Sequence, residues 1–402
     1  MILAIDTSCD ETSAAVTDGR RVLSNVISSQ IQIHKKYGGV YPALAKRAHQ
    51  ERIDFVVNEA LRRAEKNLEY SNSSPASHLS LLTYHLPISA IAVTQGPGLA
   101  IALEVGIKKA KEIINEAMKQ SNNHLPLIAV NHLEGHIYSC LALPAKQKTE
   151  DGKQTADKQI ANSDLSVNSA ISPLSSILCF PGLCLIVSGG HTELVLMKDH
   201  GNYEVIGATL DDACGEALDK AAKILRLGYP GGPIIEKLSE QFFSSSKFKV
   251  QSSKFLFNQP LKEKSNLNFS YSGLKTQLLY LVQKMSDEQL GKNLLPLAFS
   301  FQEACFEQII RKTSDAIEMY QPKTLLCGGG VIANKYLRKL LRRMAKEKAL
   351  PVLFPPSKNL ITDNAAMIGV AAWYKFQRKE FVKDIEGLDR EPRLSLVSSI
   401  KY

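Results

Sequence analysis

The sequence predicts an α/β protein in which one architectural unit occurs twice. Each half holds a hairpin with a polar tip, over residues 1–17 and again over residues 183–197. Each half also holds a strand that runs through a glycine turn into a helix, over residues 90–117 and again over residues 324–346. Strands that alternate with helices favour layered α/β packing, and the repetition predicts two lobes with a cleft between them.

Both hairpins follow from the apolar pattern. In the first, the apolar run Ile2–Ile5 is followed by the polar segment Asp6–Thr12, and the strand pattern resumes up to Val16. In the second, Leu183–Val187 is followed by the turn Ser188-Gly189-Gly190-His191 and a further apolar stretch. Short apolar runs on either side of turn residues are typical of strands.

The distribution of polar residues predicts the domain boundaries. We expect an N-terminal lobe over residues 1–144, a polar inserted loop over residues 145–178 and a C-terminal lobe over residues 179–402, with the last helix packing back on the N-terminal lobe. The inserted loop is poor in apolar residues, a composition that cannot support a core. A second polar stretch, residues 68–86, is rich in Ser, Asn and His.

The bulk composition favours a cytoplasmic protein without a membrane segment. Of 402 residues, 44% are hydrophobic, which is enough for a large core, but no apolar run is long enough to span a bilayer. The first residues lack the basic start of a signal peptide. The seven cysteines form no CxxC pair, which is typical of reduced thiols in a cytosol. The net charge of +9 allows an anionic partner such as nucleic acid, without requiring one.

Two histidines spaced for one helical face are a candidate metal site. Leu127–Val130 is a short strand, Asn131 suits a helix N-cap, and Glu134 lies where a capping box places its acid. His132 and His136 then stand one turn apart and can bind one transition metal. The spacing alone favours two unrelated histidines. A zinc protease is a weak interpretation, because the acid lies in the middle of the motif rather than beside the first histidine.

A third metal ligand would be an acid at a helix start or in a loop. Thr362-Asp363-Asn364 opens a helix that extends to Phe376, and Asp363 is the candidate. The competing interpretation is that Thr362 or Asp363 only caps that helix.

Two glycine turns could hold a nucleotide. Ser188-Gly189-Gly190-His191 and Gly328-Gly329-Gly330 let backbone N–H groups approach a phosphate, and the second turn precedes a helix start. We expect Asn334 in the first turn of that helix, where its side chain could bond a ribose or a phosphate.

An acidic segment begins another predicted helix. The acids of Asp211–Lys220 match the helix dipole, but Asp219 lies too deep in the helix for that explanation. The loop Gly228–Pro233 that follows is rigid and could close over a flat ring.

Residues 241–268 mix phenylalanines with lysines. The simpler interpretation packs the aromatic side chains inward and leaves the lysines in water. The alternative is a basic, aromatic surface for RNA.

Taken together, these motifs resemble one family, the TsaD family of tRNA threonylcarbamoyl transferases. They occur in family order over nearly the whole chain apart from the two insertions. The segments that carry the resemblance are Asp6–Thr12, Tyr37–Pro42, Gly96–Leu99, Asn131–His136, Val187–Thr192, Asp211–Lys220, Tyr229–Pro233, Phe269–Thr276, Gly328–Asn334 and Thr362–Asn364.

The resemblance implies an actin-like, sugar-kinase-like two-lobed ATPase fold with duplicated α/β units. It implies transfer of a threonylcarbamoyl group from threonylcarbamoyl-AMP to the exocyclic amine of the adenosine beside the anticodon, in tRNAs that read codons beginning with A. The implied partners are tRNA, a TsaB-like paralogue and a TsaE-like ATPase, with no membrane.

The resemblance also implies site residues. His132, His136 and Asp363 match the family's ligands for one divalent metal ion, iron by preference and zinc as the alternative. The matching adenylate-binding positions are Ile186, Val187, Ser188, Gly189, Gly190, Asp219, Gly232 and Asn334.

Two acids at the first hairpin tip are candidates for catalysis. An exocyclic adenine amine is a poor nucleophile, so a nearby base would help it. Asp10 and Glu11 could give electrostatic or proton-transfer help, or could equally order the loop.

Two segments depart from the family pattern. The family usually has Pro-Glu-Leu-Ala-Ser-Arg where this chain has Pro42-Ala43-Leu44-Ala45-Lys46-Arg47, so the role of that loop is open. The segment Asp389–Arg393 is a loose match.

Other classes of protein stay open on the residues alone. A small-molecule kinase of the same fold would use ATP and magnesium and would not need the two histidines. A non-catalytic scaffold like the TsaB relatives would lose the metal ligands, which are all present here.

Overall fold

The computed structural model describes residues 1–69, 86–121, 124–144, 178–244 and 255–397. The inserted loop predicted over residues 145–178 and the polar stretch 68–86 lie almost entirely outside these residues. Within the described residues, none of the helices combines the length and the apolar character that a bilayer-spanning segment needs.

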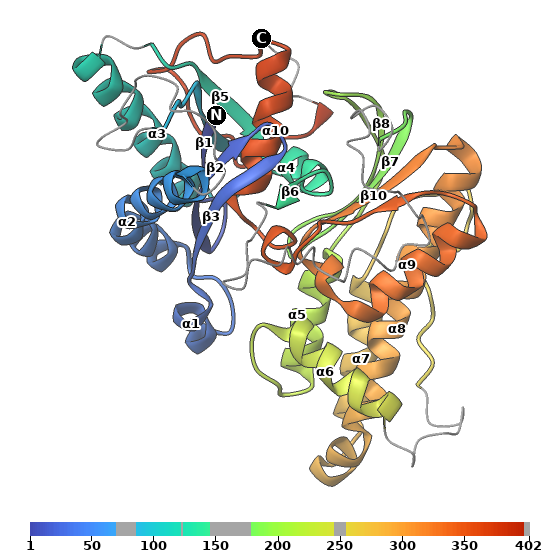
Figure 1. The fold of residues 1–402 in the computed structure, drawn as a ribbon. Helices are drawn as coiled ribbons and strands as arrows, with labels where there is room; N and C mark the ends of the chain where they lie inside the picture. The colour runs from blue at the N-terminus through green and yellow to red at the C-terminus, as the bar shows by residue number, and fades with distance from the viewer. Residues whose placement is uncertain (70–85, 122–123, 145–177, 245–254, 398–402) are drawn as a thin grey trace, which may run out of the picture. The chain divides into compact units, whose positions relative to one another are not determined.

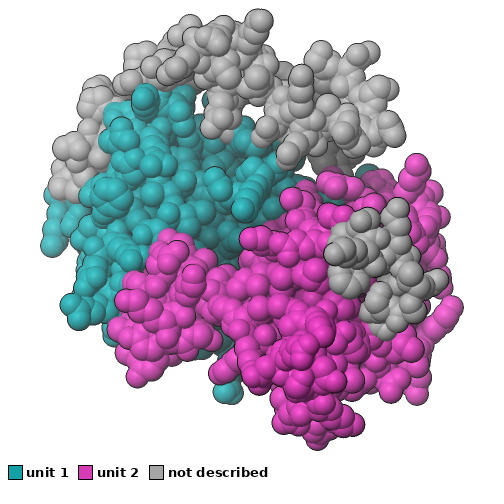
Figure 2. Space-filling view, turned by 90° about the horizontal axis from the view of Figure 1, so that it is seen from below, with its two compact units in different colours: residues 1–28, 46–179, 354–402 teal, residues 29–45, 180–353 magenta. Residues whose placement is uncertain are grey.

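The chain divides into two compact units (Figure 2). Unit 1 comprises residues 1–28, 46–179 and 354–402, and unit 2 comprises residues 29–45 and 180–353. Residues 29–45, which we assigned to the first lobe, therefore group with unit 2. Residues 354–402, which we assigned to the second lobe with the last helix packing back on the first, group with unit 1, so α10 (Ala365–Gln377) does pack on that lobe.

The sheet of unit 1 has the strand order β5-β4-β1-β2-β3-β6. β1 pairs antiparallel with β2 and parallel with β4, and β4 pairs parallel with β5. The strands are β1 (Ile2–Asp6), β2 (Glu11–Asp18), β3 (Arg21–Ser29), β4 (Ala90–Gly96), β5 (Leu127–Asn131) and β6 (Leu143–Pro144).

The sheet of unit 2 has the strand order β11-β10-β7-β8-β9. β7 pairs antiparallel with β8 and parallel with β10. The strands are β7 (Gly182–Val187), β8 (Thr192–Asp199), β9 (Asn202–Ala208), β10 (Thr324–Gly328) and β11 (Val352–Leu353). The order matches that of unit 1 from β5 to β3, position for position, so the predicted repetition of one α/β unit is confirmed.

The helices are drawn in Figure 1. They are α1 (Ile31–His34), α2 (Pro42–Glu69), α3 (Ala100–Ser121), α4 (His132–Ser139), α5 (Cys214–Ile224), α6 (Gly231–Ser244), α7 (Ser272–Gln283), α8 (Asp287–Tyr320), α9 (Lys335–Glu347) and α10 (Ala365–Gln377). Short 3-10 turns are η1 (Lys35–Tyr37), η5 (Gly330–Ala333) and η6 (Lys358–Leu360).

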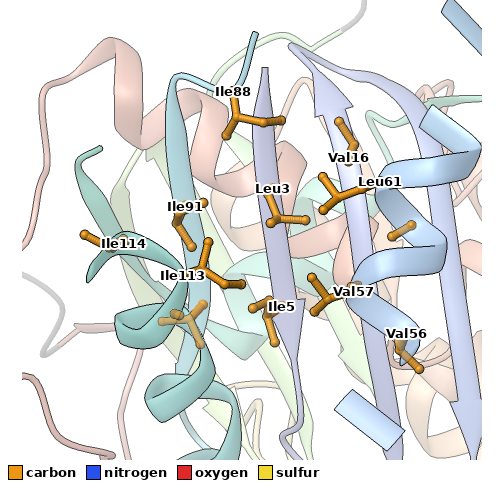
Figure 3. Packing of buried hydrophobic residues seen from close by; sticks show 14 of the residues in the cluster. Leu3, Ile5, Val16, Val56, Val57, Leu61, Ile88, Ile91, Ile113 and Ile114 are labelled. Atoms are coloured by element: carbon orange, nitrogen blue, oxygen red, sulfur yellow. The ribbon is translucent and has the colours of Figure 1, made fainter. Parts of the chain in front are cut away.

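One face of the unit 1 sheet forms a core with α2 and α3. Leu3 and Ile5 of β1 pack in one cluster with Val57 of α2 and Ile113 of α3 (Figure 3). All four side chains are almost completely buried. The apolar run that predicted β1 therefore supplies the centre of this core.

The opposite face of β1 lies under α10. Successive side chains of a strand alternate between faces, so Ala4 and Asp6 point away from Leu3 and Ile5. A Cβ built on Gly369 of α10 would lie only 3.3 Å from the Ala4 Cβ, so the helix backbone approaches the sheet closely. This alternation brings Asp6 to the side of the sheet that carries α10.

Candidate functional site

The start of α4 is fixed by its cap. The Asn131 side chain accepts a hydrogen bond from the Leu133 N–H at 2.9 Å, so the predicted N-cap is confirmed. The Asn131 Nδ2 also donates to the Leu394 carbonyl at 3.4 Å. The cap thus sets the direction in which the histidines of the next turns project.

Glu134 faces the end of α10. Its buried carboxylate lies 3.7 Å from Lys375 Nζ and 3.9 Å from Arg378 Nη2. The capping role of this acid stays a prediction, and the structure shows it as a charge partner between the two helices. Because the carboxylate of Glu134 faces these two cations, it cannot act as the general base that a zinc protease needs.

The three predicted metal ligands lie together in unit 1. His132 Nε2 is 3.4 Å and His136 Nε2 is 3.3 Å from the same oxygen, Asp363 Oδ1. All three candidate ligand atoms lie within 4.8 Å of one another. The histidines are buried, and their rings meet edge to face with centroids 4.7 Å apart.

Asp363 can face the histidines because its neighbour caps the helix. The Asn364 side chain is the N-cap of α10 and accepts a hydrogen bond from the Met367 N–H at 3.0 Å. The alternative in which Thr362 or Asp363 caps this helix is therefore wrong.

A glycine between the two histidines lets α4 approach α10. A Cβ built on Gly135 would lie 2.9 Å from Ile368 Cδ1 and 3.1 Å from Met367 Cγ. A larger residue here would require these two side chains, or α4 itself, to shift. The sequence His-Leu-Glu-Gly-His thus provides both the ligands and the close packing that they need.

The residues of this cluster fit a divalent transition metal. Buried polar atoms normally have hydrogen-bond partners. Within the described part of the chain, His132 Nδ1, Asp6 Oδ2 and both ring nitrogens of His136 are buried without one. Ligands about 2.1 Å from a tetrahedral ion lie about 3.4 Å apart, which is close to the two separations from Asp363. Two imidazoles and one carboxylate suit zinc or non-haem iron.

The protonation of the cluster reflects burial and the carboxylates. Burial lowers the pKa of His136, which keeps a lone pair available. Burial also disfavours the charged form of His132, but Asp363 and Asp6 outweigh it and raise the pKa of His132 to about 10. Despite burial, the two histidines hold the pKa of Asp363 well below its usual range.

Asp6 joins this cluster, although the sequence analysis gave it no role there. Its carboxylate is completely buried, and Oδ1 lies 3.8 Å from His132 Nδ1. The same oxygen accepts a hydrogen bond from the Ser8 N–H at 3.2 Å. The alternation of β1 was the available signal, because it separates Asp6 from the core residues Leu3 and Ile5.

The candidate acids Asp10 and Glu11 lie in the same unit, where β1 turns into β2. Asp10 is buried, and Glu11 is the first residue of β2. Burial, then Asp10, then Asp363 raise the pKa of Glu11 well above its usual value. The turn follows Asp6, whose carboxylate lies 3.8 Å from His132 Nδ1, so it begins beside the histidine cluster. Catalytic roles for these acids stay a prediction.

The first glycine turn of unit 2 has an open backbone. The Ser188 N–H donates to the His191 carbonyl at 2.8 Å, and the His191 N–H donates to Ser188 Oγ at 3.1 Å. No heavy atom lies within 4 Å of a Cβ built on Gly189 or Gly190. The Gly215 N–H donates to the Ser188 carbonyl at 3.2 Å, so the start of α5 lies beside this turn.

Asp219 anchors the start of the next helix. Its Oδ1 accepts hydrogen bonds from Gly231 N–H at 2.6 Å and Gly232 N–H at 3.2 Å. We predicted a loop over Gly228–Pro233, but α6 begins at Gly231. The loop prediction is wrong there because a distant carboxylate satisfies the first N–H groups of the helix.

Asn334 caps α9 instead of lying within its first turn. Its Oδ1 accepts from the Leu337 N–H at 3.0 Å, and its Nδ2 donates to Gln302 Oε1 at 2.9 Å. The predicted helix therefore starts at Lys335, after the 3-10 turn η5. All predicted adenylate positions, including Ile186 and Val187 at the end of β7, lie in unit 2. Their contact with a nucleotide stays a prediction.

The two acids before α5 do not interact with the dipole of that helix. They bond serine and lysine side chains instead. Asp211 accepts hydrogen bonds from the hydroxyls of Ser270 and Ser272, both at 2.6 Å. Asp212 lies 2.5 Å from Lys220 Nζ and 2.6 Å from Lys275 Nζ. Because α5 begins only at Cys214, the prediction that these two acids start the helix is wrong.

The aromatic segment packs mainly inward where it is described. Phe242 stacks on Phe299 with centroids 4.9 Å apart, and Phe257 meets Phe301 edge to face. Phe243 is 58% exposed but also contacts Phe299. Phe248 lies outside the described residues.

Comparison with solved structures identifies the class of fold. The chain is similar to the crystal structure of full-length HypF in its phosphate- and nucleotide-bound form, with a TM-score of 0.52 and 13% identity over 94% of this chain and 55% of that chain. With the repeated sheet order, this similarity shows the actin-like, sugar-kinase-like fold.

Sequence comparison then identifies the family. The family model TsaD, tRNA N6-adenosine threonylcarbamoyltransferase, matches residues 21–73, 78–150 and 165–370. The chain is 40% identical over 382 residues to the enzyme of that name from Moorella thermoacetica, covering 94% of this chain and 93% of that one. It is 38% identical over 405 residues to that of Bacillus subtilis, covering 99% and 96%. The chain belongs to the TsaD family and is a transferase.

Proposed function

We propose that the chain transfers the threonylcarbamoyl group from threonylcarbamoyl-AMP to tRNA. The acceptor is the exocyclic amine of the adenosine beside the anticodon, in tRNAs that read codons beginning with A. The names of the relatives support the N6 amine of a tRNA adenosine as the acceptor. The observation that supports the chemistry is the cluster of buried His132 and His136 with half-buried Asp363.

The reaction forms one bond and breaks one. The adenine amine attacks the carbamoyl carbon, and the bond between that carbon and the phosphate oxygen breaks, so AMP leaves. The amine loses one proton. Charge develops on the carbonyl oxygen and on the leaving phosphate, so groups that stabilise negative charge would lower the barrier.

His132, His136 and Asp363 would hold one divalent ion, iron by preference and zinc as the alternative. When bound, such an ion supplies Lewis-acid stabilisation of the developing negative charge. Asp6, which lies 3.8 Å from His132, orients the ring of that ligand.

Glu11 and Asp10 would receive the proton that the amine loses. Burial and the neighbouring carboxylates raise the pKa of Glu11. A carboxylate with a raised pKa is a better proton acceptor near neutral pH than an ordinary one. The pair would therefore aid a nucleophile that is weak on its own.

The glycine turns of unit 2 would bind the adenylate part of the donor. A Cβ built on Gly189 or Gly190 meets no heavy atom within 4 Å, so this turn leaves room beside its backbone for a phosphate. Asp219 fixes Gly231 and Gly232 by two hydrogen bonds. These contacts would orient the donor, which is a large part of the rate advantage in a two-substrate reaction.

The proposed partners follow from the family. They are tRNA, a TsaB-like paralogue and a TsaE-like ATPase, in the cytoplasm where the tRNA is modified. The net charge of +9 is compatible with a polyanionic substrate.

The test combines the purified chain, these partners, threonylcarbamoyl-AMP and unmodified tRNA. Mass spectrometry of the digested tRNA should detect threonylcarbamoyladenosine. His136→Ala should lose the bound metal and reduce the yield by about 100-fold or more, because the ion loses one of three protein ligands. His200→Ala, which removes a histidine of unit 2 that packs on Phe180, should behave like the wild type. Absence of the modified nucleoside with the wild type would refute the transfer. A metal-free protein with full activity, or an unchanged yield with His136→Ala, would refute the metal assignment.

A further inference from the structure

The turn that carries Asp10 and Glu11 is held firmly on the side of α3. The Leu99 N–H donates to the Ser8 carbonyl at 2.8 Å. Thr7 Oγ1 donates to the Ala102 carbonyl at 2.8 Å and accepts from the Gly106 N–H at 3.2 Å. These bonds fix Thr7 and Ser8, which precede the acids. They act on neither acid directly.

A histidine of α2 holds the same turn around the acids themselves. His49 Nε2 lies 3.0 Å from the Cys9 carbonyl oxygen, and His49 Nδ1 lies 2.8 Å from Thr12 Oγ1. The ring is completely buried. Cys9 and Thr12 are the residues immediately before and after Asp10 and Glu11, so the imidazole spans the acid pair.

The chemistry of the two partners fixes the tautomer. A carbonyl oxygen only accepts, so His49 Nε2 must carry the hydrogen. In the neutral ring Nδ1 then has a lone pair, which accepts the hydroxyl hydrogen of Thr12. Burial lowers the pKa of His49, which keeps the ring in this neutral form. Both ring nitrogens are therefore satisfied in one orientation.

We propose that His49 is a positioning residue for the transfer reaction. By bonding the residues on either side of Asp10 and Glu11, His49 holds these two acids beside the cluster of candidate metal ligands. The inference rests on the proposed catalytic roles of these two acids. His49 touches neither the donor nor the acceptor in this account, and it acts through the shape of the turn.

The segment Pro42–Arg47, whose role the sequence leaves open, forms the start of the helix that carries His49. α2 begins at Pro42, and His49 follows about two turns later along the helix. The charged side chains of this segment bond at its surface, Lys46 with Glu104 and Arg47 with Glu51.

A set of matched variants separates positioning from simple support of the fold. His49→Phe keeps a ring but removes both bonds, and Thr12→Val removes only the hydroxyl. Both should lower kcat by about tenfold or more, with KM for tRNA and metal content unchanged, since a misplaced acid fails only in the chemical step. Thr12→Ser keeps the hydroxyl and should restore kcat.

His34→Phe is the control for loss of a buried, hydrogen-bonded histidine. His34 is also completely buried, and it lies 3.2 Å from Gln30 Oε1, in unit 2. This variant should lower the melting temperature without a comparable change in kcat. An equal loss of kcat in His34→Phe and His49→Phe would overturn the inference in favour of a general packing role.

The decisive measurement repeats His49→Phe in a background with Asp10→Asn and Glu11→Gln. If His49 acts through the acids, its substitution should change kcat by less than about twofold in that background. The same fold-loss in both backgrounds would overturn the inference. If the acid variants alone leave kcat unchanged, the proposed roles of the acids fail, and the inference fails with them. If the acid variants lower kcat but His49→Phe and Thr12→Val do not, only the inference fails.

Discussion

At the scale of single residues, one position decides what Asp363 does. Thr362, Asp363 and Asn364 can each cap a helix by side-chain type, so the sequence leaves both uses of Asp363 open. In the structure Asn364 bonds the Met367 N–H, and the carboxylate before it is directed to the histidines. The sequence could predict the residue types of this site. Only the packing of α10 on the sheet decides which of them caps.

Glu193 gives a pH prediction for the stability of unit 2. Burial raises its pKa to about 7 from a model-peptide value of 4.5. The folded state therefore keeps a proton that the unfolded chain has already lost, and wild-type stability falls as the pH rises from 4.5 to about 7. Glu193→Gln has no carboxyl group that titrates, so its free energy of unfolding does not fall in this way. Between about pH 5 and about pH 8, the free energy of unfolding of the variant should therefore rise by about 1–3 kcal/mol relative to that of the wild type.

Urea unfolding of both proteins at the two pH values measures this difference. The pairing of Glu193 with Ile186 of β7 and Ala208 of β9 should persist in the variant, because Gln keeps the same side-chain length. Parallel pH profiles for the two proteins would contradict the prediction.

At the scale of elements, the strands and the start of α4 were predictable, but the starts of α5 and α6 were not. β1, β2, β7, β8 and β10 follow from short apolar runs beside turn residues, which are local signals. The start of α6 depends on Asp219, which is twelve residues earlier than Gly231 in the sequence. Asp211 bonds Ser270, at a separation of 59 residues. No local pattern contains such partners, so these two helix starts could not be predicted.

The contact between α4 and α10 predicts the effect of a larger residue at Gly135. Gly135→Val would bring side-chain atoms into Ile368 and Met367, and overpacking of this kind costs about 1–3 kcal/mol. We expect the Ile368 and Met367 side chains to relieve part of this contact and a shift of α4 to relieve the rest, so the separation of His132 and His136 from Asp363 should grow and metal affinity should fall. Thermal unfolding and a metal titration measure the two effects.

Gly291→Ala is the control, because it enlarges a glycine in a helix that has no such contact. Gly291 lies in α8 with no heavy atom within 4 Å of a built Cβ, so alanine should stabilise the helix by about 0.5–1 kcal/mol. Unchanged metal affinity in Gly135→Val would show that the close approach of the helices is not needed for the ligand geometry.

At the scale of the whole molecule, the charge predicts how tRNA binding responds to salt. A chain with a net charge of +9 that neutralises phosphates releases condensed counterions, so its affinity falls as salt rises. Between about 50 and 200 mM salt we expect the affinity for unmodified tRNA to fall at least about tenfold. Fluorescence anisotropy measures the affinity, and the melting temperature of the protein in the same buffers shows that folding is unaffected. Salt-independent affinity would exclude a mainly electrostatic interface.

The discontinuous path of the chain through unit 1 has a consequence for synthesis on the ribosome. The two histidines are translated long before Asp363, which belongs to the last of the three segments of that unit. Residues 180–353, nearly all of unit 2, emerge before the segment that completes unit 1. A nascent chain therefore completes its set of three candidate metal ligands only near the end of translation, and a polypeptide released before residue 363 lacks the third of them.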